Sequence, residues 1–141
     1  MKLEKTIEIK APRAKVWAAL VDIQNWPLWS ESMTKIERLD DGPFGKGSKA
    51  RITQPNVPPL TWKVVAFEPG VSFAWQATTR GVTTWANHQI APAGDGRCTL
   101  TLAIKQSGVL AWLASLALGK QTRGYVLMEA EGLKRYCESP T

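Results

Sequence analysis

The sequence contains little cysteine and histidine, the residues on which many metal and catalytic sites depend. Among its 141 residues there are two cysteines, Cys98 and Cys137, and one histidine, His88. Two widely separated thiols and one imidazole do not match the ligand spacing of a zinc site, and they provide no disulfide framework. We therefore expect no metal ion, no cofactor, and free thiols in a reducing cytoplasm.

The sequence also lacks the segments that direct a chain into or across a membrane. Its longest nearly apolar run, Val109 to Leu118, has ten residues, whereas a transmembrane helix needs about 20. The first ten residues alternate charged and apolar side chains, unlike a signal or transit peptide. These features predict a cytoplasmic protein with a single domain, residues 1–141, and no transmembrane helix.

Sequence motifs of common catalytic and phosphate-binding sites are missing as well. There is no nucleophile elbow, and the glycines of residues 42–47 lie in a turn instead of between a strand and a helix. The net charge of +6 comes from lysines and arginines that are spread along the chain. This pattern predicts a solvated, slightly basic surface and no specific nucleic-acid site, although contact with RNA, the ribosome or an anionic membrane stays open.

What the sequence does contain is a series of short alternating segments followed by one long helical segment. Alternation of apolar and polar residues predicts seven strands, at Leu3–Lys10, Thr34–Leu39, Ser48–Thr53, Leu60–Phe67, Val71–Thr79, Val82–Ala91 and Arg97–Gln106. Two short helices are expected between the first two strands, one over Arg13–Ile23 and one ending near Glu31, with a break at Pro27.

The last thirty residues predict one long helix. Residues 108–138 lack proline and are rich in helix formers, so they should form a rod of about 45 Å, with Ser107 as its N-cap. Apolar residues recur at helical spacing along one stripe: Trp112, Leu116, Val126, Ala130, Leu133 and Cys137. Gly119 and Gly124 predict a kink or a close contact between this helix and the sheet.

The order of these elements predicts an α+β fold in which a seven-stranded antiparallel sheet curves around the C-terminal helix. Seven strands at about 4.8 Å span about 30 Å, whereas one helix is about 10 Å thick. One helix cannot cover a flat sheet of this width. The sheet must therefore curve, or a cavity must remain between sheet and helix, or both.

The opening of the chain carries a pattern that resembles a known family. It reads Ile-x-Ile-x-Ala-Pro-x-x-x-Val-Trp-x-x-Leu-x-Asp over residues 7–22, and Asn-Trp-Pro-Leu-Trp follows at 25–29. With the Glu-Pro-Gly turn at 68–70 and the Gly-Asp-Gly turn at 94–96, it is similar to the START-like, helix-grip superfamily (SRPBCC), in the branch named for polyketide cyclases/dehydrases and lipid transport. The resemblance covers nearly the whole chain. It implies a deep pocket between sheet and long helix that takes a hydrophobic or amphipathic small molecule of lipid, polyketide, isoprenoid or aromatic type.

Seven tryptophans are many for a chain of this length. Aromatic side chains either pack a core or form the wall of a cavity, where they offer a flat surface and an N–H donor, and both alternatives stay open for Trp62 and Trp75. The candidates for ligand binding are Trp29, Trp62, Phe73, Trp75, His88, Trp112 and Leu116.

His88 is the candidate catalytic residue. Strand alternation places it on the same face as Ile90, so it points inward if Ile90 does, and Trp85 then points outward. A lone interior histidine is more often a hydrogen-bonded core residue than a catalyst. The sequence places no carboxylate beside it, because the facing of Glu129 and Glu131 on the long helix is undetermined.

Two segments are candidates for ligand access or partner contact. Pro55 to Pro59 lies between the third and fourth strands, where receptor-type members of the superfamily carry a gate loop; the alternative is a rigid surface loop. Val109 to Leu118 is apolar nearly all round, beyond the roughly 100°-wide stripe that packing requires. The surplus is available to line the cavity mouth, to form a homodimer, or to touch a membrane.

The sequence leaves three hypotheses of function. The first is a protein that binds or carries a hydrophobic small molecule. The second is an enzyme of the cyclase or dehydratase type that uses His88 as acid or base. The third is an interaction module for the ribosome, a chaperone or a membrane surface.

Overall fold

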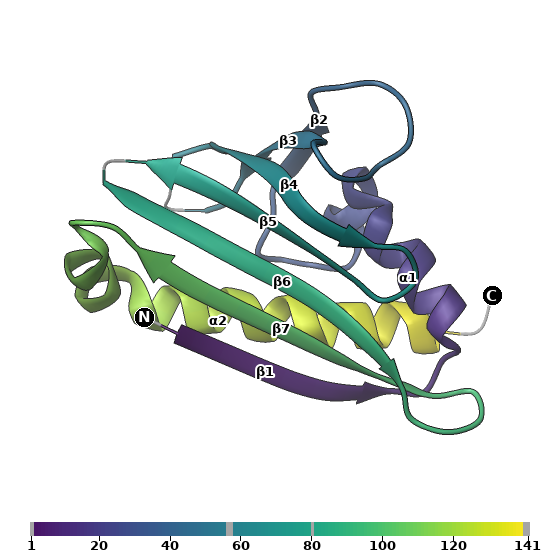
Figure 1. Ribbon diagram of the computed structural model, residues 1–141. Coiled ribbons are helices and arrows are strands. Elements are labelled where there is room, and N and C mark those ends of the chain that lie inside the picture. Colours follow the sequence, from purple (N-terminus) through teal and green to yellow (C-terminus); the bar gives the residue numbers. More distant parts are fainter. Residues whose placement is uncertain (1, 56–57, 80, 140–141) are drawn as a thin grey trace.

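The chain forms one antiparallel sheet that lies along a long C-terminal helix (Figure 1). The computed structural model describes residues 2–55, 58–79 and 81–139, without the side chains of 112–118. Its elements are β1 (Lys2–Ile9), α1 (Arg13–Val21), the 3₁₀ helix η1 (Ile23–Leu28), β2 (Lys35–Arg38), β3 (Lys49–Thr53), β4 (Leu60–Glu68), β5 (Ser72–Thr79), β6 (Val82–Pro92), β7 (Cys98–Ser107) and α2 (Ala111–Glu138). The predicted α+β architecture, with seven strands, two short helices and a long terminal helix, is confirmed.

The sheet is a meander of six consecutive strands to which the first strand is added. Its order is β1-β7-β6-β5-β4-β3-β2, so β1 joins the edge formed by β7. The pairing runs from Lys2 opposite Lys105 to Ile9 opposite Cys98. This pairing brings the first strand beside the last one and leaves β1 and β2 as the two edges.

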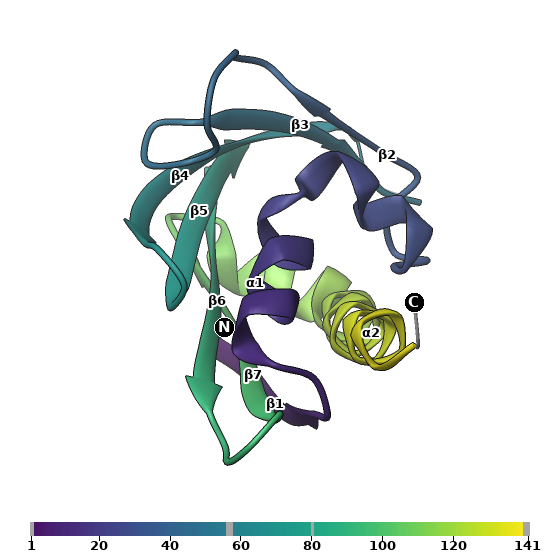
Figure 2. The same ribbon diagram turned by 90° about the vertical axis from the view of Figure 1, so that its right-hand side faces the viewer.

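The sheet curves around the helices (Figure 2). In this view α1, η1 and α2 lie inside the arc that the strands form. The β4–β5 register shifts between Val64 and Ala66, an irregularity that increases local twist and bend. Because the sheet curves, the side chains on its concave face point toward α2.

The first helical region ends differently from the prediction. Pro27 does not break it: the chain leaves helical geometry at Asp22, with ψ near 65°, and Pro27 then lies inside η1. Asp22 also accepts a hydrogen bond from the Asn25 side chain at 2.7 Å, which stabilises this turn locally. The break therefore comes from a turn five residues before the proline.

The start of α2 also differs, because Ser107 is the last residue of β7 and not the N-cap. Leu110 takes the N-cap position without a side-chain hydrogen bond. Between them Gly108 has a φ of +112°, and a β-carbon there would collide with the Gly81 carbonyl. Glycine permits the tight approach of this connection to the β5–β6 turn.

The apolar stripe of α2 is buried at every position whose side chain is described. The exposed fraction is 4% or less for Val126, Ala130, Leu133 and Cys137. The other two residues of the stripe, Trp112 and Leu116, are among those whose side chains the structure does not describe. A close contact occurs at Gly132, where a β-carbon would meet the Trp29 carbonyl. Of the two alternatives predicted at Gly124, the close contact is wrong, since a β-carbon there would have open space, and the kink stays a prediction. Among the described residues, no helix has the length and apolar character needed to cross a bilayer.

Candidate functional site

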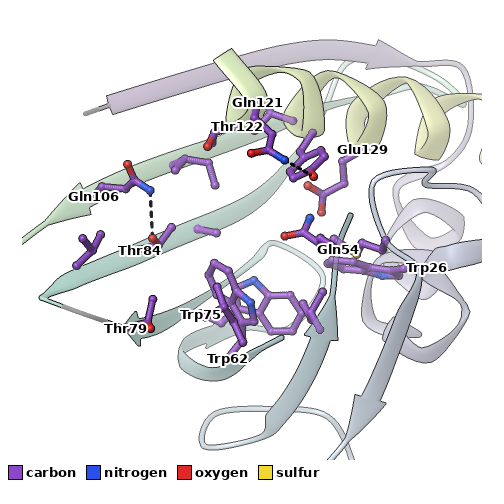
Figure 3. Close-up of a pocket in the computed structure, with 18 of the residues that line it drawn as sticks. Trp26, Gln54, Trp62, Trp75, Thr79, Thr84, Gln106, Gln121, Thr122 and Glu129 are labelled. Atoms are coloured by element: carbon purple, nitrogen blue, oxygen red, sulfur yellow. Dashed lines mark hydrogen bonds between the residues drawn. The ribbon is translucent and has the colours of Figure 1, made fainter. Parts of the chain in front are cut away.

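A cavity of about 350 Å³ lies between the concave face of the sheet and α2. Figure 3 shows its side chains converging from both layers. It is lined by Trp26, Met33, Ile52, Gln54, Pro58, Leu60, Trp62, Trp75, Thr79, Val82, Thr84, Ala86, His88, Ile104, Gln106, Gln121, Thr122, Tyr125, Val126 and Glu129. Its volume falls in the range of small-molecule sites in proteins, which is about 300–1,000 Å³.

Three tryptophans form one wall of the cavity. The ring of Trp75 lies 5.4 Å from Trp26 and 5.8 Å from Trp62, measured between centroids. Trp26 is completely buried, and its indole N–H donates to the Leu20 carbonyl at 3.0 Å. This bond and the surrounding rings fix the orientation of the Trp26 ring in the wall.

The structure places the predicted binding residues in different surroundings. Trp62, Trp75 and His88 line the cavity. Phe73 does not: it is fully buried beneath His88, with the two rings stacked at 4.3 Å. Trp29 does not either, because it lines a separate surface pocket beside Gly132. The side chains of Trp112 and Leu116 lie outside the described residues, so their role in binding stays a prediction.

Phe73 is absent from the wall although it shares a strand face with Trp75. Phe73 precedes Trp75 by two residues on β5 and lies nearer to α1. There the ring of Phe44 packs against it at 5.1 Å and the ring of Trp17 at 6.5 Å, measured between centroids. Strand alternation gives the face of a residue but not what covers that face. The prediction for Phe73 therefore identified an inward residue that other side chains enclose.

His88 lies at the centre of the site and is 3% exposed. Its Nδ1 is 3.2 Å from the Phe73 carbonyl oxygen. A carbonyl only accepts, so Nδ1 carries a proton and donates it. The other ring nitrogen, Nε2, lies 3.6 Å from Oε1 of Glu129 on α2. The predicted inward facing of His88 is confirmed, and the structure supplies the carboxylate partner that the sequence did not.

Glu129 is the main site residue that sequence reasoning missed. Its side chain is 14% exposed and points from α2 into the cavity (Figure 3). Its spacing contained the signal, because it follows Val126 by three residues and precedes Leu133 by four. Both of those residues belong to the buried stripe, and residues three or four apart share a helix face.

A polar zone lies at the end of the cavity near the β5–β6 turn. There Gln106 donates from Nε2 to the Thr84 hydroxyl at 3.3 Å, while its buried Oε1 has no hydrogen-bond partner among the described residues. Within the same part of the chain, the buried Nε1 of Trp62 also lacks a partner. Buried polar atoms are nearly always hydrogen-bonded in proteins. These two atoms are exceptions, and because both are covered by protein, a ligand in the cavity would meet other polar groups of the lining, such as Gln54 and Thr79.

The proline loop between β3 and β4 is tied to α2 beside the cavity. Tyr125 donates from its hydroxyl to the Pro55 carbonyl, and Gln121 Nε2 lies 3.3 Å from the same oxygen. Pro58 lines the cavity, whereas residues 56 and 57 lie outside the described part of the chain. A gate function for Pro55 to Pro59 stays a prediction, as do the roles proposed for residues 109–118.

The two cysteines lie in the core. Burial raises the pKa of the Cys137 thiol to about 11 and also raises the pKa of Cys98. Within residues 2–55, 58–79 and 81–139, no three His, Cys, Asp or Glu side chains group together as metal ligands would.

The sequence matches one family model along nearly its whole length. The model describes polyketide cyclase/dehydrase and lipid transport, and it matches residues 1–138. Uncharacterised proteins of Mycobacterium tuberculosis and Mycobacterium bovis are 25% identical over 104 residues. That match spans 72% of this chain and 62% of the relatives' length.

Solved structures share the fold at low sequence identity. An aromatase/cyclase from Streptomyces superposes with a TM-score of 0.81 at 16% identity, covering 98% of this chain and 93% of that one. A START superfamily protein from Mycobacterium smegmatis gives a TM-score of 0.75 at 14% identity, with 97% of each chain covered. These similarities confirm the predicted helix-grip fold.

Proposed function

Because the chain belongs to the polyketide cyclase/dehydrase and lipid transport family of the START-like superfamily, we propose that it binds a hydrophobic or amphipathic small molecule between the sheet and α2. The cavity of about 350 Å³, with its wall of Trp26, Trp62 and Trp75, is the observation that carries this proposal. Concave, largely apolar sites with a few convergent polar groups are typical of small-molecule binding.

The test of binding uses the protein purified from its own host. Native mass spectrometry should detect a co-purified compound, and a Trp75→Ala variant should lose it because the central ring of the wall is gone. Leu39→Ala is a control, since Leu39 is exposed on the surface outside the cavity. Wild-type protein that carries no compound, and that binds none from an extract of its host, would refute the proposal.

A second candidate function is acid–base catalysis, and the contact between His88 and Glu129 favours it. With Nδ1 donating to the Phe73 carbonyl, Nε2 is the nitrogen free to take a proton. The Glu129 carboxylate at 3.6 Å would stabilise the imidazolium that forms. In a dehydration, Nε2 would remove a proton from the carbon next to a carbonyl and return it to the leaving hydroxyl. The products would be an unsaturated carbonyl compound and water.

This candidate is tested with a naphthyl β-hydroxyketone, whose dehydration is followed by absorbance of the enone. His88→Gln should abolish turnover, and Glu129→Gln should reduce it by a factor of roughly 10² or more. Glu131→Gln, an exposed change on the same helix, should leave it unchanged. Turnover that persists in His88→Gln would remove this mechanism while leaving the binding function in place.

Location and assembly remain part of the proposal. Two buried thiols with raised pKa values suit a reducing cytoplasm.

The predicted homodimer is supported by the exposed side chains of Val109 and Leu110, directly before α2. Sedimentation of wild-type protein and of a Val109→Ser variant would test that contact.

A further inference from the structure

We propose that the cavity selects an uncharged or cationic ring compound and rejects carboxylates and phosphates. This inference rests on the proposed binding function and specifies the chemical class of the ligand. It separates two kinds of compound that the family description covers, because many lipids carry an anionic head group, whereas cyclised aromatic compounds need not.

The first observation is the charge of the lining. Among the described side chains that line the cavity, none is a lysine or arginine; besides the phenol of Tyr125, the ionisable groups are the paired His88 and Glu129. The 3.6 Å contact places the two groups within ion-pair distance. A neutral His88 leaves the pair with the negative charge of Glu129, and a single shared proton makes the pair neutral. In neither state does the pair offer a net positive charge to an anion.

The positive charge of the protein lies elsewhere. The strand register aligns Lys2 with Lys105, Lys105 with Trp85, Trp85 with Gln76, Gln76 with Lys63, and Lys63 with Lys49. Side chains of directly paired residues point to the same face of a sheet, so four lysines form one row across it. Trp85, which belongs to this row, is directly preceded and followed by residues of the cavity face, Thr84 and Ala86. The row is therefore on the outer face.

This separation has a consequence for ligands. An anion that enters the cavity loses its hydration, finds no lysine or arginine among the described lining residues, and meets the Glu129 carboxylate. A hydroxyl or carbonyl group loses far less hydration. It can regain hydrogen bonds from polar side chains of the lining, such as Gln54 and Thr79. An amine can in addition face Glu129 and the tryptophan rings.

The size of the cavity narrows the class further. A volume of about 350 Å³ corresponds to about a dozen groups of the size of water, at about 30 Å³ each. That is the size of a compound with two or three fused rings, and a lipid with two acyl chains is much larger. The aromatic wall of Trp26, Trp62 and Trp75, whose rings are tilted by 58° and 39° to one another, offers apolar ring faces and edges to such compounds.

The test compares probes that differ only in their polar group. Isothermal titration calorimetry at pH 7 would measure 2-(2-naphthyl)ethanol, 2-(2-naphthyl)ethylamine and 2-naphthylacetate. The alcohol and the amine should bind, and the carboxylate should bind at least about tenfold more weakly because its charge is not compensated. Carboxylate binding within about threefold of the alcohol would overturn the inference and leave the proposed binding function intact. A folded protein that binds none of the probes would count against the binding function, and the inference would fall with it.

Variants assign the selectivity to one residue. Glu129→Gln should raise the affinity for naphthylacetate, whatever the protonation state of His88. The gap in affinity between naphthylacetate and naphthylethanol should therefore become smaller. Glu131→Gln, exposed on the same helix, should leave the gap unchanged. A gap of equal size in Glu129→Gln would show that Glu129 does not set the selectivity and would overturn this part of the inference. Should Glu129→Gln fail to fold, the comparison of the probes on the wild-type protein still decides whether anions are rejected.

Discussion

His88 is held in one orientation by contacts around its ring. One ring face stacks on Phe73 at 4.3 Å and 16°, Trp75 meets it edge-on at 5.8 Å, and Trp26 packs at 5.5 Å. The hydrogen bond from Nδ1 to the Phe73 carbonyl fixes the remaining rotation. As a result, Nε2 is directed at Glu129. A histidine fixed in this way can position a ligand or transfer a proton without first losing side-chain freedom.

Cys137 provides a prediction at the scale of single residues. Burial raises the pKa of its thiol to about 11, so at pH 8 only about one molecule in a thousand carries the reactive thiolate. The pKa of Cys98 is raised for the same reason. We expect almost no reaction of the native protein with Ellman's reagent at pH 8, and two equivalents after unfolding in guanidinium. Rapid reaction of a native thiol would show that the packing around it opens.

At the scale of elements, α2 is positioned by a contact that only glycine allows. Gly132 lies against the Trp29 carbonyl, in the turn that follows η1. A neighbouring backbone cannot move aside as a flexible side chain can. This contact sets how closely the helix approaches the first helical region. It therefore also helps to set how far Glu129, one turn earlier, reaches toward His88.

Two alanine substitutions in α2 should have opposite effects. Gly132→Ala forces a β-carbon into the Trp29 carbonyl, and we expect it to lower the free energy of unfolding by about 1–3 kcal/mol. Gly124→Ala meets open space and should raise it by about 0.5–1 kcal/mol, because alanine favours the helix. Urea unfolding of both variants measures the difference. Equal effects at the two positions would contradict the contact at Gly132.

At the scale of the whole molecule, the end of α2 is tied to the beginning of the chain. The Glu138 carboxylate accepts hydrogen bonds from Lys134 Nζ at 2.6 Å and from the Lys10 backbone N–H at 2.7 Å. Lys134 also donates to the Glu8 carbonyl at 2.8 Å. These bonds join the end of β1 to the last turn of α2.

This tie predicts a pH dependence of stability. The hydrogen bonds from Lys134 and from the Lys10 backbone lower the pKa of Glu138 below 4.5. The contribution of the Glu138 carboxylate to the free energy of unfolding is therefore present above pH 4.5. It is lost as the pH falls through the lower pKa of the folded state. Glu138→Gln should reduce the free energy of unfolding by at most about 1 kcal/mol at pH 7, since the pair is partly exposed. The difference from wild type should shrink at pH 3.

Urea unfolding at both pH values measures this difference. Glu131→Gln is the matched control, because Glu131 is exposed on the same helix. It should differ little from wild type at either pH. If Glu138→Gln lowers the free energy of unfolding by the same amount at pH 7 and pH 3, ionisation of Glu138 does not cause the loss of stability.

The sequence by itself determined the elements and the facing of their residues. Alternation in β6 is a local property of the backbone, so it predicted that His88 shares the face of Ile90, and both residues are buried. The width of seven strands against one helix predicted a curved sheet, a cavity or both, because strand spacing and helix diameter do not depend on sequence. The opening motif added the family.

The tertiary structure alone decided which distant residues meet. The spacing of Glu129 from Val126 and Leu133 indicates its inward face, but its contact with His88 depends on where α2 lies against the curved sheet. Phe73 is enclosed because Phe44 and Trp17, from other parts of the chain, cover it. The row of outward lysines exists because five strand pairings have particular registers. Such contacts depend on the packing of the complete chain, whereas strand and helix periods depend only on neighbouring residues.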